Sequence, residues 1–318
     1  MKFRFFRVAA IAALVAAASA GSAQLGGLGG LGDKLKRRTP LSLLQGRPPI
    51  TTSLEDARWG DATKDGFTPR DATRSLMTLQ RTPNGGFVLQ AGYYALQVQS
   101  YCLKAGTHGP GGGDGYLYAP PKGPAEDAVM TIVRNSVNRP EIPQSNIQQL
   151  LWAIIARAKF EDLRGELRAT ASQLLTPRQL ASLNRSALDV LQGNALTDAL
   201  GGVPAPLRQI AQAEAQLRQM LTTPGASFAE MERVAVLSGA APRGEGSRDV
   251  PSGRWSLHPD GYYVRYLPSG YSSTRVEIWV PQGSPAVGKE FDPAAHIAVP
   301  GNTSRQRLIQ SGRAQRGA

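Results

Sequence analysis

The 318-residue chain contains one cysteine, Cys102, and only three histidines. A single cysteine cannot form a disulfide within the chain, so its thiol is buried, paired with another chain, or chemically reactive. No CxxC pair and no HExxH motif occurs, and the histidines are scattered. Metal sites in proteins draw on clusters of such ligands. The sequence therefore predicts no metal site and no cofactor.

The chain also lacks the short motifs of common enzyme classes. No glycine-rich loop with a lysine precedes a helical pattern, and no serine stands in a G-x-S-x-G context. The glycines at 111–113 and 115 follow Pro110 in a loop and predict a flexible turn rather than a ligand cradle. We therefore expect a protein that is not an enzyme.

Long apolar runs are confined to the N-terminus. Three positive charges in the first seven residues precede an apolar run at 8–20, and small residues follow it. This order is typical of a secretory signal peptide, and the run falls short of the roughly 20 residues that span a bilayer. We predict cleavage after Ala20 or Ala23 and an exported protein that is periplasmic, at the cell surface or secreted. After signal cleavage, no transmembrane segment is expected.

Acidic residues are outnumbered: 24 Asp and Glu stand against 36 Lys and Arg, for a formal net charge of +12. A basic exported protein is attracted to anionic surfaces such as lipopolysaccharide and wall polymers. The basic runs lack the interleaved aromatic residues of single-strand nucleic-acid binders. We therefore predict an anionic envelope polymer, a glycan or a protein as partner, and no specific nucleic-acid recognition. Charge that serves solubility alone is the alternative.

Helical periodicity dominates the middle of the chain. Tyr94, Val98 and Tyr101 follow i, i+4, i+7 spacing, which predicts a helix over 87–104. Further helices are predicted over 124–138, over 144–162, from Thr176-Pro177, over 204–222 and over 227–237. A proline that follows a capping threonine is typical of a helix start.

Alternating patterns replace helical ones after residue 254. Val276, Ile278 and Val280 alternate with other residues, as in a sheet with one wet face. Strands are predicted over 255–258, 262–267 and 274–280. The predicted fold class is α+β, with a helical domain followed by a small antiparallel β-meander. The predicted organisation is a signal peptide at 1–23, an extended Gly/polar lead at 24–84, a helical domain at 85–238, a linker at 239–253, a β-meander module at 254–300 and a basic polar tail at 301–318.

Two short motifs bear on the chemistry of Cys102. Tyr101-Cys102-Leu103 resembles the aromatic-cysteine motif of bacterial surface thioester domains, and the segment 147–152, Ile-Gln-Gln-Leu-Leu-Trp, is similar to their Gln-x-apolar-apolar-Trp helix motif. The resemblance implies that a thiol and a glutamine side chain lose ammonia to form an internal thioester, which acylates an amine on a host target.

The resemblance is limited to these two motifs. The apolar-Gln-apolar motif that supplies the bonded glutamine in that family is not evident near the C-terminus. Gln148 therefore stands as a substitute partner for Cys102. The alternative is that Gln148 and Trp152 are ordinary i, i+4 neighbours on a core helix.

A third hypothesis for the thiol is a cysteine hydrolase. Cys102, His108 and Asp114 lie close in the sequence, and a thiol, an imidazole and a carboxylate can form a nucleophilic site. The predicted helix would place Cys102 near its C-terminus, where the helix dipole raises the pKa of a thiol. This environment opposes a reactive thiolate and favours a buried structural cysteine.

Aromatic and basic residues gather in the predicted meander. Aromatic rings beside arginines suit the binding of sugars, wall polymers or a protein edge. The candidate binding residues are Trp255, Tyr263, Arg265, Tyr271, Arg275 and Trp279. Half of the rings could instead form the core of a small domain. The leading hypothesis is an exported, non-catalytic binding or structural protein of the cell envelope, with the thioester adhesin and the hydrolase as alternatives.

Overall fold

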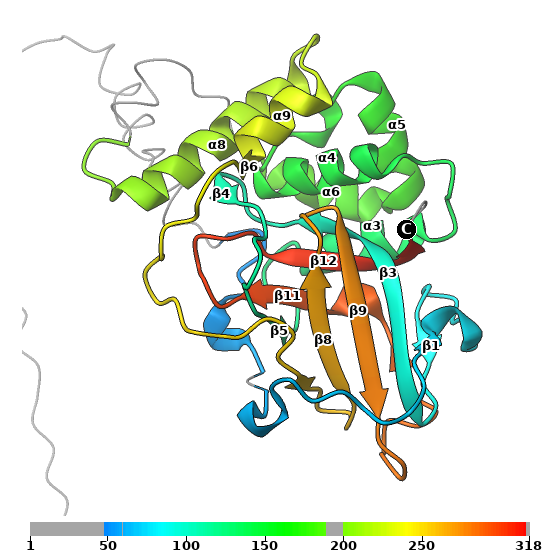
Figure 1. The fold of residues 1–318 in the computed structure, drawn as a ribbon. Helices are drawn as coiled ribbons and strands as arrows, with labels where there is room; N and C mark the ends of the chain where they lie inside the picture. Colours follow the sequence, from blue (N-terminus) through cyan, green and yellow to red (C-terminus); the bar gives the residue numbers. More distant parts are fainter. Residues whose placement is uncertain (1–47, 59, 189–199, 316–318) are drawn as a thin grey trace, which may run out of the picture. The chain divides into compact units, whose positions relative to one another are not determined.

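The segment that ends at Cys102 is a strand, and it organises the sheet. In the computed structural model, β3 (Gly92–Cys102) pairs antiparallel with β9 (Ser273–Val280) on one side and with β12 (Leu308–Ala314) on the other (Figure 1). The structure describes residues 48–58, 60–188 and 200–315. The predicted signal peptide lies outside the described residues.

One sheet of eight strands contains β3 at its centre. Its order is β5-β11-β12-β3-β9-β8-β7, with β1 paired in parallel to β3 off this path. The other strands of this sheet are β1 (Arg74–Ser75), β5 (Tyr116–Ala119), β7 (Ser256–Leu257), β8 (Tyr263–Pro268) and β11 (Ile297–Pro300). The sheet curls so that its two edges approach, and the Tyr118 N–H donates to Ser256 Oγ at 3.1 Å. The result is a nearly closed barrel.

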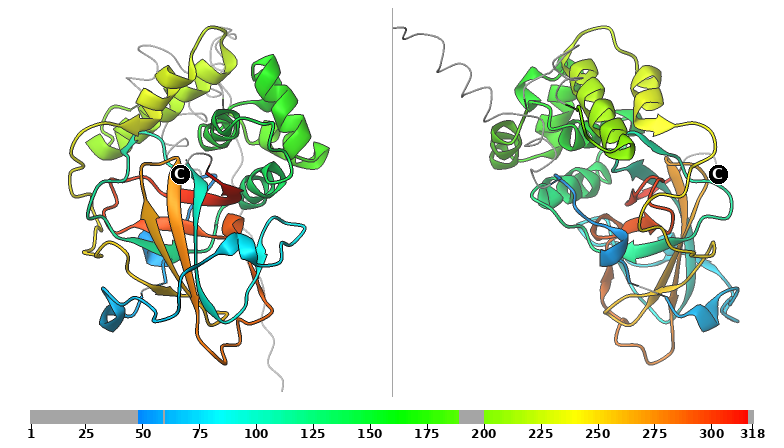
Figure 2. Two further views of the ribbon diagram at one scale, coloured as in Figure 1. Left: turned by 45° about the vertical axis from the view of Figure 1, so that its right-hand side comes forward. Right: turned by 90° about the vertical axis from the view of Figure 1, so that its left-hand side faces the viewer.

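Helices gather at the end of the sheet where β3 finishes (Figures 1 and 2). They are α3 (Glu126–Ser136), α4 (Gln144–Ile155), α5 (Gly165–Leu174), α6 (Pro177–Arg185), α8 (Ala205–Thr222) and α9 (Phe228–Ala235). Two short pairs complete the strands, β2 (Phe87–Val88) with β10 (Glu290–Phe291) and β4 (Thr107–His108) with β6 (Val236–Leu237). None of the helices in the described residues is both long and apolar enough to cross a membrane.

The helix boundaries follow local signals. Helix α6 begins after Thr176 with Pro177 at its first position, as predicted, and Thr176 also forms a capping box with Gln179. The central helix α4 buries Trp152 completely, but it ends at Ile155 rather than at 162. Arg157 adopts a positive φ of 53°, which stops the helical path.

The predicted division into a helical domain and a small meander is wrong. Strands from 85–238, from 254–300 and from 301–318 belong to the same sheet. The segment 87–104, predicted as a helix, contains the strands β2 and β3 instead. The prediction failed because β3 is buried on both faces and shows no clean alternation of apolar and polar residues. The predicted polar tail contributes β12, whose residues Leu308–Ser311 are buried.

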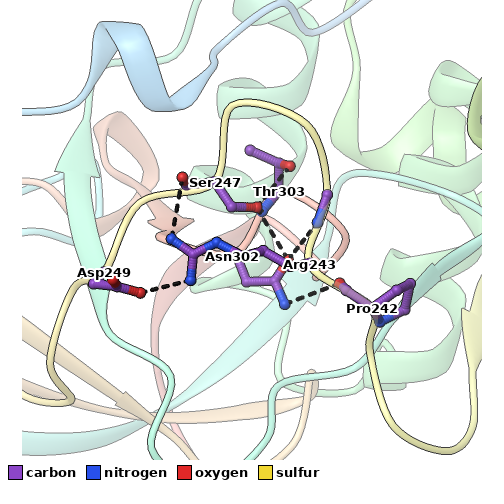
Figure 3. Close-up of polar contacts among 7 residues, drawn as sticks. Pro242, Arg243, Ser247, Asp249, Asn302 and Thr303 are labelled. Atoms are coloured by element: carbon purple, nitrogen blue, oxygen red, sulfur yellow. Dashed lines mark hydrogen bonds and ion pairs between the residues drawn. The ribbon is translucent and has the colours of Figure 1, made fainter.

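The glycine-rich segment 239–253 does not join two domains, since the strands before and after it share one sheet. Its polar groups are bonded to the turn after β11 (Figure 3). Asn302 Nδ2 donates to the Pro242 carbonyl at 3.1 Å, and the Thr303 N–H donates to Ser247 Oγ at 3.0 Å. Arg243 forms an ion pair with Asp249 at 2.6 Å within the segment. The segment is therefore held against the turn at 301–304.

Candidate functional site around Cys102

Cys102 ends β3 at a place where only one neighbouring strand pairs with it. Its partner on β12 is Leu308, while the pairing of β3 with β9 stops at Gln99. The side chain of Gln148, from α4, occupies the unpaired side. Gln148 Oε1 accepts from the Cys102 N–H at 2.9 Å, and Gln148 Nε2 donates to the Cys102 carbonyl at 3.1 Å. The amide of Gln148 thus replaces the peptide group of a missing strand.

Trp152 lies one helical turn after Gln148 and contacts the sulfur. Its Nε1–H donates to Cys102 Sγ at 3.0 Å. Residues four apart lie on the same face of a helix, so α4 presents both side chains to the end of β3. The two sequence motifs, which are separated along the chain, therefore meet at Cys102. Gln148 forms hydrogen bonds with the backbone of Cys102, and Trp152 donates a hydrogen bond to its sulfur.

The thiol is enclosed and neutral. Cys102 has 0% exposure, and burial raises the pKa of its thiol to about 12, against the lowering effect of the Trp152 hydrogen bond. The cause is burial in the sheet rather than the predicted helix C-terminus, since no helix contains Cys102. The thiol is therefore protonated at neutral pH, so any attack by its sulfur must include transfer of the thiol proton.

Helix α9 and the turn between β8 and β9 cover this region. Phe228 of α9 stacks on Trp152 with 5.5 Å between the ring centroids. Tyr271, in the turn, donates a hydrogen bond to Glu232 of α9. The charge of Glu232 also contributes to the raised pKa of the Cys102 thiol.

A second glutamine lies diagonally across from Cys102 on β12. Leu308 pairs with Cys102 and Gln310 with Ser100, so all four side chains project from the same face. Diagonal neighbours in an antiparallel pair are roughly 7–8 Å apart, within reach of a long side chain. Gln310 has 0% exposure; its Nε2 donates to the Leu308 carbonyl at 3.1 Å, and its Oε1 has no hydrogen-bond partner.

Gln306 lies two residues before Leu308 and is held differently. Its Nε2 donates to the carbonyls of Thr107 and Ala235 at 3.2 and 3.0 Å. Gln310 is therefore the glutamine of β12 whose amide is bonded only within its own strand. Sequence reasoning missed it, although Ile309-Gln310-Ser311 offered an apolar-Gln pair in the C-terminal segment.

The residues of the hydrolase hypothesis are not brought together. Across the described ranges, no hydrogen bond or ion pair joins the His108 side chain to Cys102, and His108 Nδ1 is buried without a partner. Asp114 pairs with Arg305 instead. No group of three His, Cys, Asp or Glu side chains that could hold a metal occurs in the part of the chain that the structure describes.

The candidate binding residues of the β-face largely satisfy one another. Trp255 is fully buried and donates to the Phe67 carbonyl at 3.0 Å. Arg265 and Arg275 both bond the buried carboxylate of Glu277, at 2.6 and 2.7 Å. Burial alone would raise the pKa of Glu277, but hydrogen bonds from Tyr93 and the two arginines lower it overall. These charges form an internal network rather than an open ligand site.

Two aromatic residues of the β-face stay half-buried. Tyr263 and Trp279 stack with 5.0 Å between centroids, and Phe67 packs against Trp279 at 5.0 Å. Tyr271 is bonded to Glu232 and belongs to the cover over Cys102. Of the six candidates, Tyr263 and Trp279 are the two that belong neither to the charge network nor to the cover.

Comparisons with protein-family models, curated proteins and solved structures found no match to this chain.

Proposed function

We propose that this exported protein forms an internal thioester between Cys102 and Gln310 and uses it to bond covalently to an amine on a partner. The observation that carries the proposal is the diagonal placement of Gln310 beside Cys102 on the strand paired with it. We assign the acyl donor to Gln310 rather than to Gln148, because both ends of the Gln148 amide are bonded to the Cys102 backbone.

The bond-forming step needs no external reactant. Cys102 Sγ attacks the side-chain carbonyl carbon of Gln310; the carbon–sulfur bond forms and the carbon–nitrogen bond breaks. The thiol proton moves to the amide nitrogen, which leaves as ammonia. An amine of the partner then attacks the thioester carbonyl, an amide bond forms, and the thiol is released.

The surroundings of Cys102 suit an activated acyl group that must survive in water. The sulfur is fully buried, and Trp152, Phe228 and the α9 cover separate it from solvent. Exclusion of water protects a reactive intermediate from hydrolysis. The Trp152 N–H, which donates to the sulfur, and the Gln148 amide, which holds the strand end, orient the reacting atom.

Intact mass spectrometry of the mature chain tests the proposal. The expected mass is short by one ammonia, methylamine restores a free thiol, and Cys102→Ala and Gln310→Ala each abolish the deficit. Gln306→Ala, two residues before the start of β12, is the matched control and keeps the deficit. A full mass with an intact glutamine at 310 would overturn the proposal. A deficit that survives Gln310→Ala would overturn the assignment of Gln310.

A second candidate is non-covalent binding at the cell envelope, to an anionic polymer, a glycan or a protein. The half-buried Tyr263–Trp279 stack favours it, with Lys64 Nζ 5.6 Å from the Tyr263 ring. Aromatic rings beside a cation suit a sugar face. Binding of wall glycans that is lost in Tyr263→Ala and kept in Cys102→Ala would support this candidate.

A further inference from the structure

A cavity of about 320 Å³ lies beside α8 and the chain that follows β3. Its volume is at the lower end of the range of small-molecule sites. Cys102 does not line it, so this cavity is separate from the site described above. Apolar side chains form much of its wall, among them Leu103, Ile155, Leu207 and Ile210.

Lys104 lines this cavity, and its amine is held differently from those of the other lysines in the described residues. Four of the five lysines there form ion pairs with carboxylates, namely Lys64, Lys122, Lys159 and Lys289. Within the same described ranges Lys104 forms no ion pair, and its Nζ donates to the Thr303 carbonyl at 3.3 Å. An adjacent carboxylate stabilises the charged form of an amine more than a neutral carbonyl does. Lys104 is therefore the lysine of this set that loses its proton most easily.

The wall of the cavity shifts the protonation of Lys104 in the same direction. Burial and the charge of Arg307 lower the pKa of Lys104 to about 8, against the opposing charge of Glu214. Glu214 also lines the cavity, and burial raises its pKa to about 7, although the charges of Arg157 and Arg218 act against this shift. Roughly one-tenth of Lys104 is therefore neutral at pH 7, far more than of a lysine with the usual pKa of about 10.4. The neutral amine is the nucleophilic form.

We propose that Lys104 forms an imine with a small aliphatic aldehyde whose alkyl chain lies against Leu103, Ile155 and Leu207. The neutral Nζ attacks the carbonyl carbon, a carbon–nitrogen bond forms, and the carbonyl oxygen becomes a hydroxyl group. This oxygen then leaves as water with two protons that come from the amine, and a carbon–nitrogen double bond remains. Glu214 is the nearby carboxyl group that can give and take these protons, since its pKa lies close to neutrality. This reaction is independent of the thioester.

Reductive trapping in the folded chain tests the proposal. The protein is incubated with hexanal and cyanoborohydride at pH 7, and peptide mass mapping identifies the alkylated lysines. We expect Lys104 to be alkylated at least about tenfold faster than the exposed Lys122 and Lys159, because a larger fraction of its amine is neutral. Equal rates at the three lysines would overturn the proposal.

Probes that differ in the alkyl chain separate binding in the cavity from simple nucleophilicity. The quantity compared is the ratio of the alkylation rates of Lys104 and Lys122. We expect this ratio to be at least about tenfold higher with hexanal than with acetaldehyde, because each methylene buried in the cavity contributes about fourfold. Hexanol, which has the chain but no carbonyl group, is expected to slow the reaction of hexanal at Lys104 and not at Lys122. Equal ratios for the two aldehydes would also overturn the proposal.

Variants at exposed positions test the apolar wall and leave the core intact. Leu207 lines the cavity at 50% exposure, and Leu257 on β7 is similarly exposed, at 46%. Leu207→Asn is expected to lower the hexanal ratio about threefold, whereas Leu257→Asn, the matched control, leaves it unchanged. An unchanged ratio in Leu207→Asn contradicts the proposed position of the alkyl chain. Cys102→Ala should be alkylated at Lys104 as the wild type is, so this result does not depend on the thioester.

Discussion

At the residue scale, the feature that defines the site is a side-chain amide that acts as backbone. Gln148 bonds both the N–H and the carbonyl of Cys102, at 2.9 and 3.1 Å. Both groups are buried beyond the end of β9, where no strand or solvent could satisfy them. Glutamine suits this role because its amide has the donor and acceptor pattern of a peptide group.

Loss of this amide should therefore destabilise the whole protein. We expect Gln148→Ala to lower the free energy of unfolding by about 2–4 kcal/mol, because two buried backbone groups lose their partners. Urea denaturation measures the change. Gln173→Ala, at an exposed position on α5, is the control and should change stability by less than about 0.5 kcal/mol. An equal effect of the two variants would contradict the role of Gln148 as a backbone substitute.

At the element scale, α9 and the β8–β9 turn limit the access of reagents to Cys102. The contact between them is the hydrogen bond from Tyr271 to Glu232, and Phe228 anchors α9 on Trp152. Local opening of a structure exposes buried groups, and the free energy of that opening depends on the few contacts that hold the covering element in place. Weakening the contact between the turn and α9 should open the site without unfolding the sheet.

Tyr271→Phe tests this cover. We expect native-state thiol labelling of Cys102 to accelerate by roughly two- to tenfold, the equivalent of one hydrogen bond of about 0.5–1.5 kcal/mol. The measurement is made in a Gln310→Ala background, so that the thiol is free whether or not a thioester forms. Tyr263→Phe, at the end of β8 away from this turn, should leave the labelling rate unchanged. Equal rates for both would show that α9 opens independently of Tyr271.

A second contact between elements predicts the pH dependence of stability. His296, before β11, bonds the Tyr262 hydroxyl at 2.7 Å, and its ring stacks on that of His258 with 5.1 Å between centroids. Burial lowers the pKa of His258 to about 4 and that of His296 to about 3. Both rings are therefore neutral in the folded state over a range where the unfolded chain protonates them.

The sign of the effect follows from proton uptake. Between the unfolded pKa of about 6.5 and the folded values, the unfolded chain binds more protons, so stability is complete above pH 6.5 and is lost as the pH falls. We expect the free energy of unfolding to drop on the order of 1–2 kcal/mol per histidine between pH 7 and pH 5. Denaturant unfolding at both pH values measures it, and the double variant His258→Gln/His296→Gln should lose the slope. A slope that persists in this variant would assign it to other groups.

At the scale of the whole molecule, the sheet makes the chain from β1 to β12 one cooperative unit. Strand β3 lies between β9 and β12, although β3 comes from the first part of the described chain and the other two strands come from its last part. The C-terminal strand pairs with the strand that carries Cys102, and its Leu308 and Ile309 are buried in the common core. Removing it should therefore affect every element that packs on β3.

Truncation tests this cooperativity. A chain that ends at 300 lacks β12, and we expect it to lose its cooperative thermal transition, because β3 loses its pairing and the core loses two large apolar side chains. A chain that ends at 315 keeps β12 and is expected to melt as the full chain does. A sharp transition in the shorter chain would show that β12 is peripheral to the fold.

The local elements were predictable from the sequence because their signals are local. The capping box at Thr176, the apolar face of 204–222 and the alternation of Val276, Ile278 and Val280 act within a few neighbouring residues, and the structure contains these elements. The meeting of Gln148 and Trp152 on one helical face was also implicit in their four-residue spacing.

The assembly was not predictable in this way. Burial on both faces removed the alternation that would have identified β3 as a strand, and its chance i, i+4 spacing predicted a helix instead. The pairing of Gln310 with Ser100 joins residues far apart in the chain, and no periodicity encodes such a contact. The sequence alone determined the capped helices, the turns and the presence of a single thiol. Only the tertiary structure decided which glutamine lies beside that thiol, because strand register depends on the whole sheet.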